Sequence, residues 1–531
     1  MKQAWNRVRQ HVEKIYEGGG KKATEIQKEK NKLTARQRIN YLCDAGSPFT
    51  EIGAFAGFEM YEEEGGCPAG GTVSGMGYVS GRLCVIVAND QTVKAGAWFP
   101  ITGKKNLRMQ EIAMENKLPI IYLVDSAGVF LPMQDEIFPD KEHFGRIFRN
   151  NAKMSAMGIT QIAAVMGNCV AGGAYLPIMS DETLMVEGNG FIYLAGPYLV
   201  KAAIGEDVDS ETLGGADTHN SISGIADYKF KTEEECLDHI KKIMDKLGAT
   251  ETAGFDRVTP QAPKNDNGEV YGIMSAGNSK PYNMLDIIDC ITDAGSFDQF
   301  KEDYGKTILC GYGRIDGWAV GIVANQRLIV KNKKGEMQLG GVIYNDSADK
   351  AARFIMNCNQ KKVPLVFLQD VTGFMVGSRS EQAGIIKDGA KMVNAVANSV
   401  VPKITIIIGN SYGAGNYAMC GKAYDPRFIY AWPTAKIAVM GGEQAAKTML
   451  QIQVATLKKK GELITAEDEQ QLLQKLTQRY ESQTTPYYAA ARLWVDGIIN
   501  PANTRKLISE GIAAANHNPE MPEFKTGVLQ V

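Results

Sequence analysis

The stretch "LPIIYLVDSAG" at residues 118–128 recurs in the second half of the chain as "VPLVFLQDVTG" at residues 363–373. Each copy is a continuous apolar run that meets an acidic residue and then a glycine, which is typical of a fully buried strand ending in a turn. Three further matches occur in the same order and at nearly the same offset: "DAGS" at 44–47 with 293–296, "VAND" at 87–90 with "VANQ" at 323–326, and "GNCVAGG" at 167–173 with "GNSYGAG" at 409–415. Four ordered matches predict a duplicated domain.

Each half also contains a short strand-like run, Gln161–Val165 or Ile404–Ile408, that leads through glycines into a helix-compatible segment. Buried strand, glycine turn and helix form the repeating unit of an α/β fold. Prolines and glycines accumulate between the halves, as in a linker. We therefore expect an α/β protein with an N-terminal domain at residues 1–255, a linker at 256–281 and a C-terminal domain at 282–531.

The composition excludes several classes of function. The 531-residue chain carries 58 Lys and Arg against 60 Asp and Glu, so no overall charge favours nucleic acid or an anionic membrane. Nine cysteines without a C-x-x-C pair argue against a zinc ribbon and favour a reducing compartment. No apolar run approaches the roughly 20 residues of a membrane-spanning helix. We expect a cytoplasmic protein without membrane insertion. Residues 1–32 read as a surface helix, with a mitochondrial transit peptide, and hence the mitochondrial matrix, as the alternative.

The two glycine turns are the candidate sites for chemistry. A turn that leads into a helix leaves backbone N–H groups without partners, and the helix dipole adds partial positive charge, so each turn suits a phosphate or a developing oxyanion. Neither turn has the Lys-Ser/Thr pair of a P-loop or the spacing of a dinucleotide fingerprint. A purely structural glycine turn is the competing interpretation. Two turns at equivalent positions favour function.

Side-chain signatures of hydrolases are missing from the sequence. It contains no nucleophile elbow, no Cys-His signature and no H-E-x-x-H motif. His143 and His219 could act as acids or bases, but an isolated histidine is more often a structural, hydrogen-bonded residue. Cys169, beside the first turn, reads as a small buried apolar residue. Backbone groups are therefore the main candidates for catalysis.

Longer segments of the chain carry the pattern of a known family. They are "LTARQRINYLCDAGSPFTEIG" (33–53), "TVKAGAWFPITGKKNLRMQEIAMENKLPIIYLVDSAG" (92–128), "FPDKEHFGRIF" (138–148), "QIAAVMGNCVAGGAYLPIMSDE" (161–182), "LGGADTH" (213–219), "DVTGFMVG" (370–377), "VPKITIIIGNSYGAGNYAMCGKAYDPRFIYAWP" (401–433) and "VMGGEQAA" (439–446). Together they resemble the carboxyltransferase β subunits of biotin-dependent acyl-CoA carboxylases, above all those of methylcrotonoyl-CoA carboxylase. The resemblance covers almost the whole chain.

This resemblance implies two duplicated crotonase-like domains, each a ββα superhelix. It also implies an active site between the N-domain of one subunit and the C-domain of another, within a homo-oligomeric, hexameric core. In such proteins the first glycine turn holds the thioester oxygen of the acyl-CoA, and the second holds the ureido oxygen of biotin. The matching residues are Ala171, Gly172 and Gly173 in the first turn and Gly413, Ala414 and Gly415 in the second.

The implied reaction moves a carboxyl group from carboxybiotin to an acyl-CoA, 3-methylcrotonoyl-CoA or a related short-chain acyl-CoA. Carboxybiotin supplies both the CO2 and the base, so the protein needs only to orient the reactants and stabilise two oxyanions. No ATP-grasp domain or biotinyl A-M-K-M segment is found in this sequence. The implied partners are a biotin carboxylase subunit and a biotin carboxyl carrier protein, fused or separate, which carries biotin covalently. Coenzyme A enters as part of the substrate, and no metal is expected.

Two features leave questions open. Lys104, Lys105 and Arg108 form a basic cluster with helical spacing that could meet the CoA phosphates, although we favour a solvated helix face as its explanation. Compared with relatives that act on methylcrotonoyl-CoA, about fifteen residues within 327–341 are inserted, which leaves the acyl-group preference open.

Several other functions compete with this interpretation. Within the family, the chain could serve a propionyl-CoA or acetyl-CoA carboxylase, or a sodium-pumping decarboxylase of the glutaconyl-CoA type. A crotonase-type hydratase or isomerase needs carboxylates near the thioester turn and normally a single domain, so the duplication argues against it. A non-enzymatic scaffold is the remaining class.

Overall fold

The computed structural model describes residues 1–274, 280–460 and 465–529. The contacts of the chain divide it into two compact units. The N-terminal unit comprises residues 9–252 and 491–493, and the C-terminal unit comprises residues 1–8, 253–490 and 494–531. The described part of the expected linker falls within the C-terminal unit, and residues 275–279 of that linker lie outside the described residues.

The N-terminal unit is built on one sheet with the strand order β1-β2-β3-β4-β5-β6-β8 and with β7 beside β5. The first three strands pair antiparallel, and β3 to β8 pair parallel. Parallel neighbours need crossover connections, which here carry helices. The strands are β1 Thr50–Glu51, β2 Thr72–Val79, β3 Arg82–Asn89, β4 Ile120–Ser126, β5 Gln161–Val170, β6 Glu182–Val186, β7 Phe191–Tyr193 and β8 Tyr228–Phe230; the main helices are α3 Ala35–Leu42, α4 Pro100–Asn116, α5 Phe144–Ala156 and α9 Glu233–Asp245.

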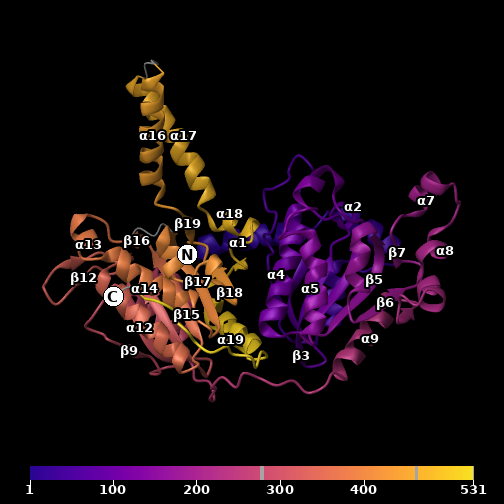
Figure 1. The fold of residues 1–531 in the computed structure, drawn as a ribbon, viewed down its shortest axis with the longest axis horizontal. Helices are drawn as coiled ribbons and strands as arrows, with labels where there is room; N and C mark the ends of the chain where they lie inside the picture. The colour runs from indigo at the N-terminus through magenta and orange to yellow at the C-terminus, as the bar shows by residue number, and fades with distance from the viewer. Residues whose placement is uncertain (275–279, 461–464, 530–531) are drawn as a thin grey trace. The chain divides into compact units, whose positions relative to one another are not determined.

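The C-terminal unit contains a second sheet with the order β20-β18-β17-β15-β11-β10-β9 and with β19 beside β17. Its strands are β9 Asp298–Phe300, β10 Ile308–Ile315, β11 Trp318–Asn325, β15 Leu365–Val371, β17 Lys403–Tyr412, β18 Phe428–Ala431, β19 Lys436–Ala438 and β20 Gly497–Ile498. Its main helices are α11 Met284–Ile291, α12 Asn345–Gln360, α14 Ile385–Ala397, α16 Gly442–Lys459, α17 Ala466–Gln483 and α19 Thr504–Ala515. Figure 1 shows α16 and α17 extending together away from this sheet.

The two sheets repeat each other strand by strand. β9, β10, β11, β15, β17, β18 and β20 hold the positions of β1, β2, β3, β4, β5, β6 and β8, and β19 lies beside β17 as β7 lies beside β5. The predicted α/β fold and its duplication are therefore confirmed. The two predicted buried strands are also confirmed, because they form the cores of β5 and β17.

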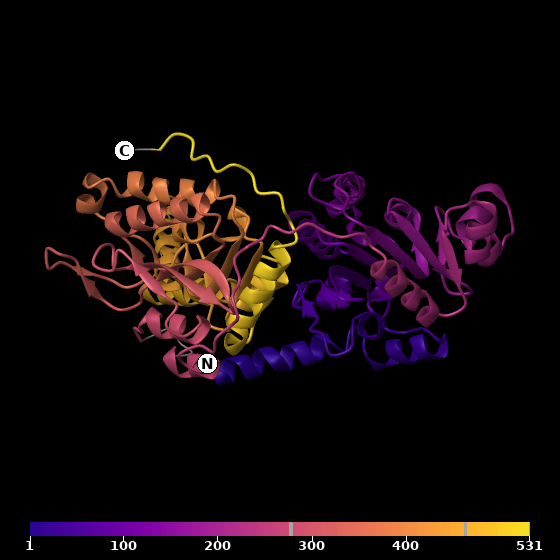
Figure 2. The same cartoon turned by 90° about the horizontal axis from the view of Figure 1, so that it is seen from below.

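Helices lie on both sides of the C-terminal sheet, as Figure 2 shows. α12 and α14 pack side by side, and α19 contacts β17 and β10. Leu365 and Phe367 of β15 are fully buried in one cluster with Phe354 of α12 and Met392 of α14. Each such side chain contributes about 1.5–3 kcal/mol when it is removed from water. The alternate residues of β15, including Asp370, face the other way.

Two local segments differ from or extend the expectations. Residues 1–32 form two helices, α1 Lys2–Ile15 and α2 Lys21–Glu29, rather than one. Gly18 and Gly20 lie between them with φ of +54° and +89°, a backbone region that suits glycine and ends a helix. No helix within the described residues is long and apolar enough to cross a membrane.

The predicted insertion forms a small hairpin of β12 Val330–Lys331 and β13 Met337–Gln338. Directly after it, β14 Val342–Ile343 pairs with β16 Gly373–Phe374, which follows β15. The hairpin is therefore tied to the carboxyl end of a central strand.

Candidate active site

The two central strands of the N-terminal unit separate at a bulge just before the first glycine turn. Val124 of β4 pairs with Val165 of β5, but Ser126 pairs with Cys169, so two steps along β4 face four along β5. A bulge bends a strand and redirects the residues that follow it. The first glycine turn therefore leaves the sheet in a direction that the bulge sets.

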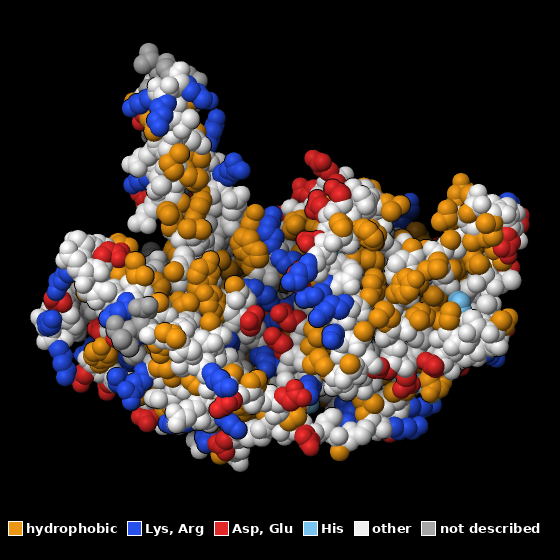
Figure 3. Space-filling view, in the orientation of Figure 1, with side chains coloured by type: hydrophobic (Ala, Val, Ile, Leu, Met, Phe, Trp, Pro, Cys, Tyr) orange, Lys and Arg blue, Asp and Glu red, His pale blue; other side chains and the backbone are white. Residues whose placement is uncertain are grey.

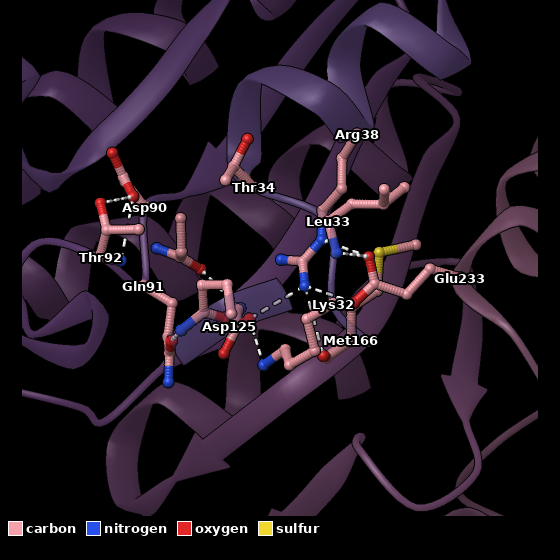
Figure 4. A network of polar contacts seen from close by, with 12 residues as sticks. Lys32, Leu33, Thr34, Arg38, Asp90, Gln91, Thr92, Asp125, Met166 and Glu233 are labelled. Atoms are coloured by element: carbon pink, nitrogen blue, oxygen red, sulfur yellow. Dashed lines mark hydrogen bonds and ion pairs between the residues drawn. The ribbon is translucent and has the colours of Figure 1, made fainter. Parts of the chain in front are cut away.

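Asp125 lies at this bulge, in the buried ionic network of Figure 4. Its Oδ2 is 2.6 Å from Lys32 Nζ and 3.0 Å from an Arg38 nitrogen, and Arg38 reaches Glu233 at 2.6 Å. Burial lowers the pKa of Lys32 more than Asp125 raises it, whereas Asp125 and Glu233 outweigh burial and raise the pKa of Arg38. A Cβ on Gly167 would lie 1.8 Å from Asp125 Oδ1, so only glycine fits there.

The same bulge recurs in the C-terminal unit. Gln369 pairs with Ile407 and Val371 pairs with Ser411, so β17 again has two extra residues opposite β15. Asp370 lies at this bulge and is fully buried. The two halves thus share a carboxylate at the point where the strand turns.

The first turn exposes its backbone. Ala171 is exposed and has φ of +56°, and a 3-10 turn leads from it into α6, Tyr175–Ile178. A Cβ on Gly172 would lie 3.0 Å from the ring of Phe144, whereas a Cβ on Gly173 would have no atom within 4 Å. Gly173 therefore borders open space in this chain.

The three residues of the second turn differ in backbone conformation, hydrogen bonding and burial. Gly413 has φ of +53°, and its N–H already donates to Ala438 O at 3.0 Å. Ala414 is exposed and begins α15, Ala414–Ala418, while Gly415 is buried against β15. Gly413 therefore shapes the turn, and the N–H groups of Ala414 and Gly415 are the candidate donors because the first N–H groups of a helix lack acceptors within it.

The helices that follow the turns are short. α6 has 4 residues and α15 has 5. The partial positive charge expected from a helix dipole is therefore small, since few aligned peptide units contribute to it. Anion binding at either turn depends on individual N–H groups.

A cavity of about 540 Å³ opens beside the second turn, within the C-terminal unit. This volume is in the range of small-molecule sites. Aromatic side chains form much of its wall, together with Gly413, Ser411 and Asn416. The aromatic residues are Tyr417, Tyr480, Tyr488 and Trp494. The cavity thus combines aromatic walls with the polar side chains of Ser411 and Asn416 beside the turn.

Comparison with known proteins decides the family. Residues 26–529 match the carboxyl transferase domain. The chain belongs to this family. It is 48% identical over 540 residues to the probable mitochondrial methylcrotonoyl-CoA carboxylase beta chain of Drosophila melanogaster, covering 99% of this chain and 91% of the relative. It is 47% identical over 502 residues to the biotin-dependent 3-methylcrotonyl-coenzyme A carboxylase beta1 subunit of Mycobacterium tuberculosis, covering 94% and 92%.

A solved structure agrees with these relatives. The beta subunit of geranyl-CoA carboxylase from P. aeruginosa matches with a TM-score of 0.87 and 36% identity, covering 100% of this chain and 96% of that one. This likeness confirms the duplicated, crotonase-like fold. The chain is thus a carboxyltransferase of the biotin-dependent acyl-CoA carboxylase type.

Sequence reasoning missed one glycine beside each turn of this carboxyltransferase. Gly128 has φ of +92°, and a Cβ built on it would lie 3.3 Å from the carbonyl oxygen of Val170. Gly373 has φ of +137°, and a Cβ built on Gly415 would lie 3.4 Å from the Cα atom of Gly373. Each turn therefore faces the loop that follows the neighbouring central strand. The signal was the final glycine shared by the repeats that end at 128 and 373.

The basic cluster predicted for the CoA phosphates of the carboxyltransferase needs correction. Lys104, Lys105 and Arg108 all lie on α4, but only Lys104 among them is exposed. Lys105 is fully buried, and its ammonium donates to Ala69 O at 2.9 Å and Thr72 O at 2.7 Å. Burial lowers the pKa of Lys105 to about 8. Arg108 is 5% exposed and pairs with a glutamate on the same helix. The three cations therefore do not form one surface.

The environments of Cys169, His143 and His219 indicate structural rather than catalytic side chains. Burial raises the pKa of Cys169 to about 12, so this thiol stays protonated. Burial lowers the pKa of His143, whose Nε2 lies 3.1 Å from Pro100 O. Nε2 of His219 lies 2.6 Å from Ile192 O. In the described part of the chain, no group of His, Cys, Asp and Glu is arranged to hold a metal ion.

Proposed function

We propose that this carboxyltransferase moves a carboxyl group from carboxybiotin to 3-methylcrotonoyl-CoA or a related short-chain acyl-CoA. The observation that carries the proposal is the identity of 47–48% with methylcrotonoyl-CoA carboxylase β chains along nearly the whole chain. The solved relative is named for geranyl-CoA. Both acyl groups carry a methyl group on the β carbon and a double bond next to the thioester. A β-methyl, α,β-unsaturated acyl-CoA is therefore the substrate class that these names support.

In this proposal the first turn holds the thioester oxygen of the acyl-CoA. Removal of a γ proton from such a thioester leaves a dienolate, and part of its negative charge rests on that oxygen. Backbone N–H groups of Ala171, Gly172 and Gly173 are suited to stabilise this charge without a catalytic side chain. The open space beside Gly173 supports this assignment, because it leaves room for a ligand atom against the backbone.

The second turn and its cavity suit biotin, which supplies the carboxyl group and the proton acceptor when it is bound. The aromatic walls of the cavity fit a bicyclic ring, and the start of α15 offers the N–H groups of Ala414 and Gly415 to the ureido oxygen. Gly413 fixes the turn, since its own N–H is already bonded to Ala438. Tyr417 and Trp494 would orient the ring and exclude water.

The proposal includes an assembly: a hexamer of this chain, in which N- and C-domains of different subunits face each other, with a biotin carboxylase subunit and a biotin carboxyl carrier protein as partners. Exposed apolar side chains support an oligomer, since such surfaces mark interfaces. Tyr198 on α7, Pro197–Ile204, is 88% exposed, and Ile452 on α16 is 62% exposed. Figure 3 shows further hydrophobic side chains along α16 and α17.

Nine free cysteines support a reducing compartment, the cytoplasm or the mitochondrial matrix.

The test is ATP- and bicarbonate-dependent carboxylation of a panel of acyl-CoAs by the tagged chain, purified from its native cells with its biotinylated partner. Methylcrotonoyl-CoA should be turned over faster than acetyl-CoA and propionyl-CoA. A different preferred acyl-CoA would replace the proposed substrate, and co-purification of a membrane decarboxylase would favour the glutaconyl-CoA type. Absence of biotin-linked transfer in either direction would refute the proposed function.

A further inference from the structure

Asp370 supplies a hydrogen-bond acceptor where the sheet cannot. At the β17 bulge the backbone leaves the ladder with β15, and Asn410 lies among the extra residues. Its N–H donates to Asp370 Oδ1 at 2.9 Å. A buried N–H without an acceptor would cost about 1–3 kcal/mol, so this bond holds the bulge in one conformation.

The charge of Asp370 is compensated from two other segments. Its Oδ2 accepts the hydroxyl of Tyr282 at 2.9 Å and lies 3.2 Å from Nε of Arg327. Asp370 is fully buried and Tyr282 is 6% exposed. Burial raises the pKa of Asp370, against the opposing effects of Arg327, Asn410 and Tyr282. The carboxylate is thus held from both sides rather than by the strand alone.

Arg327 begins the inserted segment 327–341, which is fixed close to the same point. Arg327 donates to Gly340 O at 3.4 Å, and Gly341 O accepts the N–H of Thr372 at 2.8 Å. The insertion therefore places the Arg327 guanidinium beside the Asp370 carboxylate, next to the second turn, which we call the biotin turn. Compensating the charge of Asp370 is thus a role for the inserted segment.

Hydrogen bonds connect the β17 bulge to the second turn, which begins three residues after Asn410. Ser411 donates its hydroxyl to Gln369 at 2.6 Å and accepts the side-chain amide of Asn416 at 2.7 Å. Asn416 lies in α15, whose first N–H groups are the donors proposed for the biotin oxygen. A chain of hydrogen bonds thus joins β15, the bulge and the start of α15.

We propose that Asp370, held by Tyr282 and Arg327, is a positioning residue that sets the direction of the N–H groups of Ala414 and Gly415 at the biotin turn. This inference rests on the proposed function. Asp125 has the equivalent place in the N-terminal unit, but it is held by Lys32 and Arg38. The two carboxylates have different partners, so a change at Asp370 should affect the biotin side alone.

The test uses Tyr282→Phe, which removes one hydroxyl from Asp370 and keeps the ring. The tagged full-length chain is purified with its biotinylated partner and assayed in both directions, with free biotin as the carboxyl acceptor in reverse. Misplacing a turn by a fraction of an ångström should lower kcat about tenfold and raise the KM for free biotin, with the KM for acyl-CoA unchanged. Asp370→Asn should have a larger effect in the same direction.

Matched variants separate positioning from general damage. Arg327→Met should repeat the effect, and Arg327→Lys, which keeps the charge, should recover much of it. Tyr312→Phe on β10 removes a buried hydroxyl two strands away from β15 and should change neither parameter. Wild-type values of kcat and biotin KM in Tyr282→Phe would overturn the inference, as would equal changes in both KM values. If the wild-type chain transfers nothing in either direction, the proposed function fails and this assignment fails with it.

Discussion

Gly173→Ala separates a binding role of the first turn from a structural one. A Cβ at this position has no atom within 4 Å, and Gly173 does not have the positive φ that alanine disfavours. The folded protein should therefore tolerate the methyl group, and its stability should change by no more than about 0.5 kcal/mol. The methyl group would occupy the space proposed for the thioester. The methyl group would hold the thioester oxygen away from the N–H donors, and losing the contact with one such donor costs about 2.7 kcal/mol or more, so we expect transfer to fall about a hundredfold.

The assay pairs thermal unfolding of the purified variant with its steady-state transfer to methylcrotonoyl-CoA. Gly145→Ala is the matched control, because its Cβ also meets nothing within 4 Å and it lies on α5 of the same unit. The control should keep both activity and unfolding temperature. Full activity in Gly173→Ala would refute the placement of the thioester, and a parallel loss of activity and stability would show that the turn is only structural.

The remaining predictions concern three buried residues. Lys350→Met should raise the unfolding temperature, because the buried Lys350 ammonium has no hydrogen-bond partner among the described residues. In the wild type, burial lowers the pKa of Lys350 below its ordinary value of 10.5, so between these two pKa values the unfolded state binds more protons than the folded state. The free energy of unfolding should therefore rise with pH across this window. Denaturant titrations at several alkaline pH values would show the rise. Gly167→Ala should destabilise the chain by about 3 kcal/mol or prevent folding, because its Cβ would overlap Asp125, and soluble yield and melting measure this. Cys169 should resist alkylation at pH 8 in the folded chain and react in urea, as mass spectrometry of its peptide would reveal.

The duplication and the two turns could be predicted because they depend on signals within a few residues. The apolar runs of β5 and β17 and the glycines after them are local, and their recurrence fixes the equivalence of the halves. The bulges could not be predicted, because pairing between distant strands decides which residues are extra. The aspartate shared by the two repeats was the available sign, but nothing local showed that Asp370 accepts a hydrogen bond from the neighbouring strand.

The burial of Lys105 shows a different limit. Helical spacing places Lys105 one step from Lys104, and both read equally well as surface cations. Only the tertiary structure provides the carbonyl oxygens of Ala69 and Thr72 that accept its ammonium. The lengths of α6 and α15 were likewise outside the reach of local propensity, because the chain turns into the next strand after one helical turn.

The tip of the 327–341 hairpin returns almost to its starting point. Asn332 donates its N–H to Glu336 O at 3.1 Å, and Lys333 and Lys334 between them are exposed. Additional residues placed in such a tip cost little loop-closure entropy. An epitope or a fluorophore-accepting peptide between Lys333 and Lys334 would therefore mark the protein for imaging or affinity capture without a change at either chain end.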